Sequence, residues 1–223
     1  MKKGVFIGLW LLFFGSCQKE QQPVAPVEQE PILVVPPGFP APVFPAGNEL
    51  TAARFVLGKR LFYDVVLSRD STVSCASCHA PTRAFSDSVA FSPGAGGLPG
   101  TRNAPTLANV GYHPYFTREG GVPTLEMQVL VPIQEHNEFD FNILEIVDRL
   151  KTDTAYVRLS REAYGRDPDA YTITRSIACF ERTLVSGQSR YDEFFFQGKT
   201  NALTIFEQRG MDLFFSEKTN CAG

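Results

Sequence analysis

The residues with the clearest chemical potential are Cys75, Cys78 and His79, which read C-x-x-C-H. Two thiols three positions apart can each add across a vinyl group of haem, and a histidine directly after them can place a ring nitrogen on the iron. This spacing is typical of covalent c-type haem attachment. The sequence therefore predicts a complete haem c site with His79 as the proximal iron ligand.

Two other uses of this motif are thiol redox chemistry and zinc binding. A redox pair needs only C-x-x-C in a strand–helix context, so the histidine is not explained by it. A structural zinc ion needs four ligands, whereas the chain has only 3 histidines, and Cys179 and Cys221 are not paired at metal-site spacing. Haem attachment is the favoured interpretation.

Length and composition place the chain among globular proteins. Its 223 residues suffice for one or two domains with a core, and 43% hydrophobic with 20% charged residues is ordinary. The formal net charge of −3 gives no basic surface for nucleic acid, so we expect no nucleic-acid partner.

The first 17 residues have the pattern of an export signal. Lys2 and Lys3 precede an apolar run over 5–14, and small residues lead to Cys17. A basic start, a short apolar run and small residues are typical of a secretory signal, and the run is short for a permanent membrane span. Because it ends at a cysteine, it resembles a bacterial lipoprotein signal, which predicts lipid on Cys17, a membrane anchor and a place in the periplasm or cell envelope. The alternative is an ordinary signal peptide with an incidental cysteine.

The residues between the signal and the haem motif change from linker-like to helical composition. Residues 18–48 are rich in Gln, Glu and Pro, which favours an extended tether, although its later part, 36–45, could instead pack on the domain surface. A helix is expected to begin after Thr51 as N-cap. Residues 80–111 lack periodicity and are expected to form a long loop around the haem.

Helical periodicity dominates the remainder of the chain. Asn142, with Glu145 at the third position, forms a capping-box pattern. Apolar residues recur at helical spacing in three segments, namely Leu144, Val147 and Leu150; Ile173, Ile177, Phe180 and Leu184; and Leu203, Phe206 and Phe214. Since no segment alternates as a strand would, the sequence predicts an all-α fold.

Several motifs, in the same order, resemble those of bacterial dihaem cytochrome c peroxidases and the related methylamine-utilisation dihaem oxidases. The resemblance runs from about Pro36 to the last residue. It is carried by the segments 57–64, 67–68, 75–79, 84–87, 102–107, 125–128 and 180–184.

The resemblance implies two cytochrome c-like helical domains, each with one haem. Residues 49–188 would form the N-terminal, peroxidatic domain, and 189–223 would begin the second domain. The segment 210–214 and then Cys221 match the approach to a second C-x-x-C-H motif. Cys221 is therefore expected to be a haem attachment residue, with the motif and the second domain incomplete in this chain.

The resemblance also implies a peroxidase mechanism and its residues. Hydrogen peroxide would meet the iron face opposite His79, with Glu138 as general acid–base and Gln128 as its polar companion. Electrons would come from reduced cytochrome c or another small donor. Asn103 aligns with a residue that in the family helps to bind calcium, for which an amide oxygen is suitable. Family members are often dimeric, which implies a homodimer.

Three departures from the family pattern qualify these implications. No histidine lies between positions 80 and 112, so either the peroxidatic haem is always open or His113 or another group replaces the family's activating histidine. Residues 118–120 read Arg-Glu-Gly where the family has Trp-Asp-Gly, so the aromatic residue between the haems is absent. The usual Glu-Met pair is Glu138-Phe139.

Three functions stay open at this stage. The first is a cytochrome c peroxidase that reduces hydrogen peroxide to water. The second is a dihaem oxidase that modifies a protein side chain. The third is a non-enzymatic, lipid-anchored electron carrier in which His79 is paired with a sixth ligand.

Overall fold

The computed structural model describes residues 31–222. The predicted signal peptide, the lipidation residue Cys17 and the first part of the predicted tether lie outside these residues. Within the described range the regular elements are all helices, and β-structure is limited to three isolated bridges. The predicted all-α fold is confirmed for this part of the chain.

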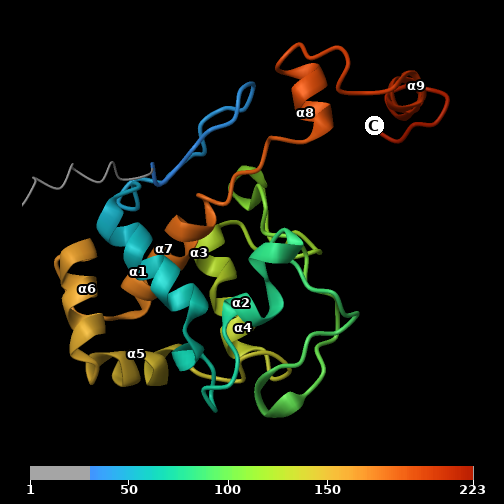
Figure 1. The fold of residues 1–223 in the computed structure, drawn as a ribbon. Helices are drawn as coiled ribbons and strands as arrows, with labels where there is room; N and C mark the ends of the chain where they lie inside the picture. Colours follow the sequence, from blue (N-terminus) through green and yellow to red (C-terminus); the bar gives the residue numbers. More distant parts are fainter. Residues whose placement is uncertain (1–30, 223) are drawn as a thin grey trace, which may run out of the picture. The chain divides into compact units, whose positions relative to one another are not determined.

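Helices α1 (Ala52–Tyr63) and α7 (Ala170–Glu181) pack against each other at the centre of the fold (Figure 1). The predicted N-cap of α1 is confirmed, because Thr51 Oγ1 accepts a hydrogen bond from the Arg54 amide at 3.2 Å. Gly58 allows the close approach, since a β-carbon there would stand 1.9 Å from the Ser176 carbonyl oxygen. This pairing fixes the position of the C-terminal end of α7.

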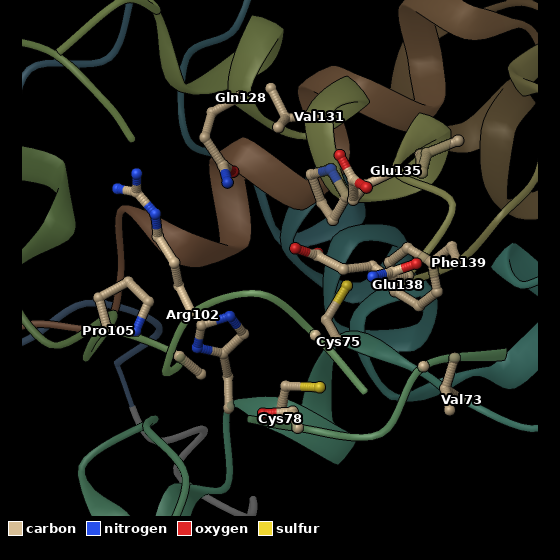
Figure 2. A pocket seen from close by; sticks show the side chains of 18 of the residues that line it. Val73, Cys75, Cys78, Arg102, Pro105, Gln128, Val131, Glu135, Glu138 and Phe139 are labelled. Atoms are coloured by element: carbon tan, nitrogen blue, oxygen red, sulfur yellow. The ribbon is translucent and has the colours of Figure 1, made fainter. Parts of the chain in front are cut away.

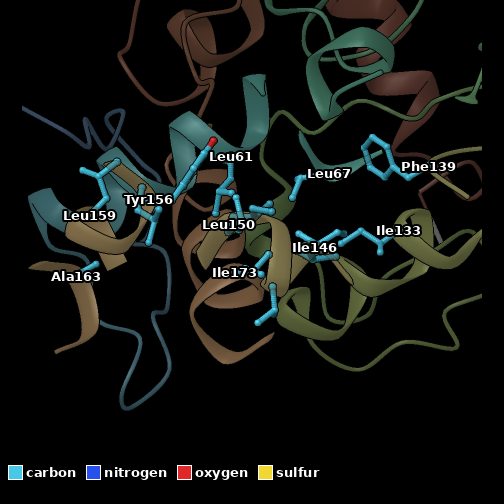
Figure 3. Close-up of a cluster of buried hydrophobic side chains, with 14 residues drawn as sticks. Leu61, Leu67, Ile133, Phe139, Ile146, Leu150, Tyr156, Leu159, Ala163 and Ile173 are labelled. Atoms are coloured by element: carbon cyan, nitrogen blue, oxygen red, sulfur yellow. The ribbon is translucent and has the colours of Figure 1, made fainter. Parts of the chain in front are cut away.

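Helices α5 (Ile143–Lys151) and α6 (Thr154–Tyr164) complete the main hydrophobic core (Figure 3). Asn142 caps α5 as predicted, with its side-chain oxygen accepting from the Leu144 amide at 2.8 Å, but the reciprocal bond from Glu145 is not formed. Leu144, which the apolar spacing groups with Val147 and Leu150, is 65% exposed. The buried face instead carries Ile146, Val147 and Leu150, and at about 100° per residue Leu144 points away from its centre.

The chain between Tyr63 and Ile143 contains short helices and a long loop. The α-helices are α2 (Cys75–Cys78), α3 (Leu125–Gln128) and α4 (Leu130–Gln134), and the 3₁₀ turns are η1 (Val65–Leu67), η2 (Pro81–Arg83), η3 (Ala95–Gly97) and η4 (Val110–Tyr112). The predicted loop over 80–111 is therefore irregular apart from single turns. It is anchored by a second buried cluster that includes Phe62, Leu107 and Phe180.

The two ends of the described range are extended or weakly buried. Residues 36–45 lie on the domain, where Phe39 packs against Tyr112 and Phe196 with ring centroids 5.9 and 5.8 Å apart. Helices α8 (Arg190–Phe195) and α9 (Ile205–Phe214) follow α7, and α9 buries none of its residues. The predicted apolar face of α9 is thus exposed, with Phe206 at 75%. The domain boundary at residue 188 stays a prediction.

No helix in the part of the chain that the structure describes is both long and apolar enough to cross a membrane.

Candidate haem site

A cavity of about 330 Å³ is enclosed by α2, α4, the loop over 92–107 and the end of α7. The cavity brings together the residues that the sequence singled out for chemistry. Figure 2 shows Gln128 at the top of the view and Cys78 at the bottom, with Cys75 and Glu138 beside each other between them. The predicted site residues that line it are Cys75, Cys78, His79, Asn103, Gln128 and Glu138. Their roles stay predictions.

His79 is held as a neutral imidazole with a defined tautomer. Its Nδ1 lies 2.9 Å from the Phe85 carbonyl oxygen, and since a carbonyl can only accept, Nδ1 carries the proton and Nε2 keeps its lone pair. Burial lowers the pKa of His79, which also favours the neutral ring. A neutral imidazole whose second nitrogen donates to a carbonyl is the usual form of a metal-ligating histidine. The Nε2 lone pair of His79 is therefore free to bind iron.

The two thiols are not suited to thiol redox chemistry. Burial raises the pKa of Cys75 well above its ordinary value, with the Glu181 carboxylate as the second cause, and burial also raises the pKa of Cys78. Redox-active cysteines need a lowered pKa. Within residues 31–222 there is also no group of three or more Cys, His, Asp or Glu side chains arranged to hold a metal ion, as a zinc site would require.

Glu138 lies in a tight loop that follows α4. The loop is closed by hydrogen bonds from the Glu138 and Asp140 amides to the Glu135 carbonyl, both at 3.0 Å. It is anchored by the buried ring of Phe139, which is part of the main core. The residue is solvent-exposed at the cavity, and desolvation by the surrounding protein, followed by the charge of Glu135, raises its pKa. A raised pKa brings a carboxyl closer to the range useful for general acid–base chemistry.

Gln128 ends α3 and projects into the same cavity (Figure 2). Its side-chain amide makes no hydrogen bond to another described residue, so both its donor and its acceptor can serve a bound molecule. Arg102 lies on the same side of the cavity and pairs with Glu119.

Asn103 lines the cavity, but its side-chain oxygen already has a partner. Arg118 Nη2 donates to Asn103 Oδ1 at 2.7 Å. Arg118 stands in the segment where the resemblance implies a tryptophan. A calcium ion bound to this oxygen would have to displace the guanidinium group.

The remaining predicted residues lie away from the cavity. His113 and His136 are exposed, and His136 pairs with Asp140 at 3.0 Å. Among the described histidines, His79 therefore stands alone in the cavity lining. Cys221 is exposed near the end of the chain, where its thiol lies 3.6 Å from the Thr219 carbonyl oxygen.

Glu181 is a cavity residue to which the sequence analysis gave no role. It is the last residue of α7, is 4% exposed, and lines the cavity. The sequence contains a signal for it, because an acidic residue directly follows Phe180 in the apolar stripe of this helix. Glutamate is almost never fully buried in a protein unless its charge is paired, so a buried glutamate in an apolar stripe is a candidate functional residue.

The donor set of the cavity fits a covalently attached haem. Two thiols and a histidine of fixed tautomer face one space, and its walls include the apolar side chains of Leu67, Val73, Val129, Ile133 and Ile177. An apolar pocket with a few placed polar groups is the usual environment of a bound cofactor. Cys75 and Cys78 would hold the haem and His79 its iron.

Comparison with known proteins decides the family. Residues 52–201 match the sequence profile described as di-haem cytochrome c peroxidase, which is more than half of the chain. The chain belongs to this family. The resemblance found in the sequence motifs is thereby confirmed, and c-type haem is the cofactor that membership implies.

Individual members of the di-haem peroxidase family show the extent of the similarity. The chain is 36% identical over 180 residues to the methylamine utilization protein MauG of Methylorubrum extorquens, covering 80% of this chain and 50% of that protein. It is 35% identical over 190 residues to a cytochrome c peroxidase of Escherichia coli, covering 82% and 40%. The chain thus spans about half the length of these relatives.

A solved structure of the same family supports the fold. A MauG-like protein associated with microbial copper homeostasis superimposes with a TM-score of 0.76 at 38% identity, covering 84% of this chain and 55% of that one. The all-α, cytochrome c-like assignment of the described residues is confirmed by this similarity.

Proposed function

We propose that the protein is a cytochrome c peroxidase, which reduces hydrogen peroxide to two molecules of water with two electrons and two protons. The observation that carries the proposal is the placement of Glu138 and Gln128 in the cavity that also contains Cys75, Cys78 and His79. When bound, the haem supplies the redox-active iron for cleavage of the O–O bond and for entry of electrons. Family members named as cytochrome c peroxidases support the same assignment.

Glu138 acts as the proton carrier in this mechanism. As a carboxylate it takes the proton from one oxygen of peroxide, and as the acid it delivers that proton to the other oxygen, which leaves as water. The loop anchored by Phe139 keeps the carboxyl group directed into the cavity. Gln128 orients peroxide by donating from its amide nitrogen or accepting at its amide oxygen.

The test is Glu138→Gln in the haem-loaded protein. General acid–base catalysis contributes about 10²–10⁴-fold, and we expect a loss of kcat/KM for hydrogen peroxide in that range while the haem absorption spectrum is preserved. Glu135→Gln, assayed at a pH well above the midpoint for Glu138, is the matched control, because it makes the same chemical change at an exposed residue of the same cavity. Unchanged peroxide turnover in Glu138→Gln would overturn the role of this carboxyl group.

A second candidate function is the oxidation of a protein side chain. It is supported by the similarity to two methylamine utilization proteins named MauG, at 36% and 34% identity, and by the absence of a second cavity-lining histidine among the described residues. Turnover of small reduced donors with peroxide supports the peroxidase. Peroxide-dependent oxidation of a protein substrate without small-donor turnover supports the oxidase.

A non-enzymatic electron carrier is the third candidate. It requires a sixth iron ligand from the protein, and the described histidines other than His79 do not line the cavity. A five-coordinate, high-spin absorption spectrum of the ferric protein would exclude this function.

The remaining features of the intact protein are proposals of the same kind. Two haems, with Cys221 as an attachment residue of the second, and calcium at Asn103 follow from the family pattern. Reduced cytochrome c or a similar small donor supplies the electrons.

Export to the periplasm or cell envelope through the predicted signal, and anchoring through lipid on Cys17, are supported by the N-terminal pattern. A homodimer is the expected assembly. Loss of lipid labelling in Cys17→Ser tests the anchor.

A further inference from the structure

Glu181 is a buried carboxyl group that the proposed mechanism does not use. Its side chain lines the haem cavity from the end of α7, and the residue is 4% exposed. Its Oε2 atom is fully buried and has no hydrogen-bond partner among the described residues. A buried charge without a partner is expensive, so a neutral carboxylic acid is the stable form here unless a positive charge arrives nearby.

The positively charged side chain next to Glu181 is already paired with another carboxylate. The neighbouring guanidinium of Arg182 donates to both carboxylate oxygens of Glu126, at 2.7 and 3.0 Å. Glu126 also accepts from Asn48 at 2.8 Å. The cation next to Glu181 is therefore already neutralised by another carboxylate.

The other charges around the cavity are of both signs. The end of α7 carries the partial negative charge of the helix dipole, and Glu138 lines the same cavity from the loop after α4. Arg102 and Arg118 also line it, but Arg102 pairs with Glu119 and Arg118 donates to Asn103. Burial raises the pKa of Glu181 to about 8, with Arg182 opposing the rise and Glu126 adding to it. The remaining facing group, the thiol of Cys75 on α2, no longer titrates once it is bonded to haem.

Glu181 also lies within electrostatic range of the haem attachment point. Its carboxylate is the second cause of the raised pKa of Cys75, and both residues line one cavity. A haem bonded to Cys75 carries one more positive charge when oxidised than when reduced. A nearby positive charge favours the carboxylate, and its loss favours the acid.

We propose that Glu181 is a redox-linked proton site of the haem pocket. Glu181 binds a proton from solvent when the haem accepts one electron from an external one-electron reductant, and it returns this proton to solvent when that electron leaves. The inference rests on the haem attachment in the proposed function and is independent of peroxide turnover.

The test is an anaerobic redox titration of the haem-loaded protein, followed by absorption, at several pH values on both sides of the pKa of about 8. A tenfold change in proton activity is worth about 59 mV for one electron. We expect the midpoint potential to fall with rising pH by up to that amount per pH unit, and Glu181→Gln to flatten the dependence. An equal slope in Glu181→Gln would overturn the proposal.

Glu135→Gln is the control, because it removes an exposed carboxyl group of the same cavity. Other groups, including the haem propionates, contribute equally to the slope of midpoint potential against pH in all three proteins. The difference in slope between wild type and Glu181→Gln therefore reports the titration of Glu181. An equal flattening in Glu135→Gln would overturn the assignment to this residue.

A second measurement covers the case in which Glu181→Gln does not take up haem. The redox difference infrared spectrum of the wild-type protein should contain a carboxylic acid C=O band that moves in D₂O, and a spectrum without such a band overturns the proposal. Because neither measurement contains peroxide, failure here is distinguishable from failure of the peroxidase assignment.

Discussion

The backbone of Gly94 lies so close to Asn137 that a β-carbon at position 94 would stand 2.2 Å from the Asn137 carbonyl oxygen. The next residue, Ala95, donates its amide to the Glu138 carbonyl at 2.7 Å. The loop around the cavity and the loop that carries Glu138 therefore fix each other in position, and only glycine fits at the contact.

Gly94→Ala should reduce peroxidase activity by displacing Glu138. A misplacement of about 1 Å can cost on the order of 10²-fold in rate, and we expect a loss of kcat/KM for peroxide of that order with haem attachment retained. Gly121→Ala is the matched control, because a β-carbon there meets no atom within 4 Å. Equal activity of the two variants, measured at matched haem content, would contradict the role of this contact.

The pH dependence of turnover should follow the raised pKa of Glu138. Burial and the charge of Glu135 raise this pKa from 4.5, and the group must be a carboxylate to accept the first proton. kcat/KM should therefore rise with pH through a midpoint above 4.5. Glu135→Gln removes the neighbouring negative charge, so the midpoint should move down in a pH–rate profile. A profile that is identical in Glu135→Gln would show that the titrating group is not Glu138.

The sequence predicts those features that depend on local spacing. The C-x-x-C-H motif predicts the haem residues, and the caps Thr51 and Asn142 mark two helix starts, because each depends on residues adjacent in the chain. The spacing of Leu144, Val147 and Leu150 does not show which face of α5 is buried, since several faces of a short helix satisfy apolar spacing and only packing selects one. Glu138 was found through the family resemblance, because a single glutamate carries no local signal. The place of Glu181 in the apolar stripe of α7 is visible in the sequence, but its position in the cavity depends on how α7 packs against α1 and α3.

Removal of one partner of the buried ion pair between Arg182 and Glu126 should be strongly destabilising, because the other charge is then left buried and unpaired. The two side chains are 8% and 12% exposed, and breaking a buried pair by removing one partner costs about 3–5 kcal/mol. Glu126→Gln should lower the free energy of unfolding by that amount in denaturant titrations. Glu162→Gln breaks the exposed pair with Arg158 and should cost no more than about 0.5 kcal/mol. Equal losses of unfolding free energy in the two variants would mean that breaking the buried pair costs no more than breaking a surface pair.

Acidification should weaken the same pair. Burial acts to raise the pKa of Glu126, but hydrogen bonds from Arg182 and Asn48 outweigh it and the pKa is lowered below 4.5. A carboxyl group whose pKa is lowered by folding stabilises the protein above the unfolded pKa, and this contribution disappears as pH falls through the folded pKa. The difference in unfolding free energy between wild type and Glu126→Gln should therefore narrow below pH 4.5. A constant difference down to acid pH would show that the carboxylate charge is not what stabilises this pair.

Calcium binding at Asn103 should be limited by Arg118. The guanidinium group donates to the only side-chain oxygen that Asn103 can offer a metal, at 2.7 Å, and a unit positive charge about 4 Å from a divalent cation in water repels it by about 2 kcal/mol. Arg118→Ala should therefore tighten calcium binding by at least about tenfold in isothermal titration calorimetry, and Asn103→Ala should weaken it in the same assay. Arg83→Ala is the control, because it removes an exposed arginine that does not bond to Asn103. Calcium affinity that is the same in Arg118→Ala, Asn103→Ala and wild type would place any calcium site elsewhere.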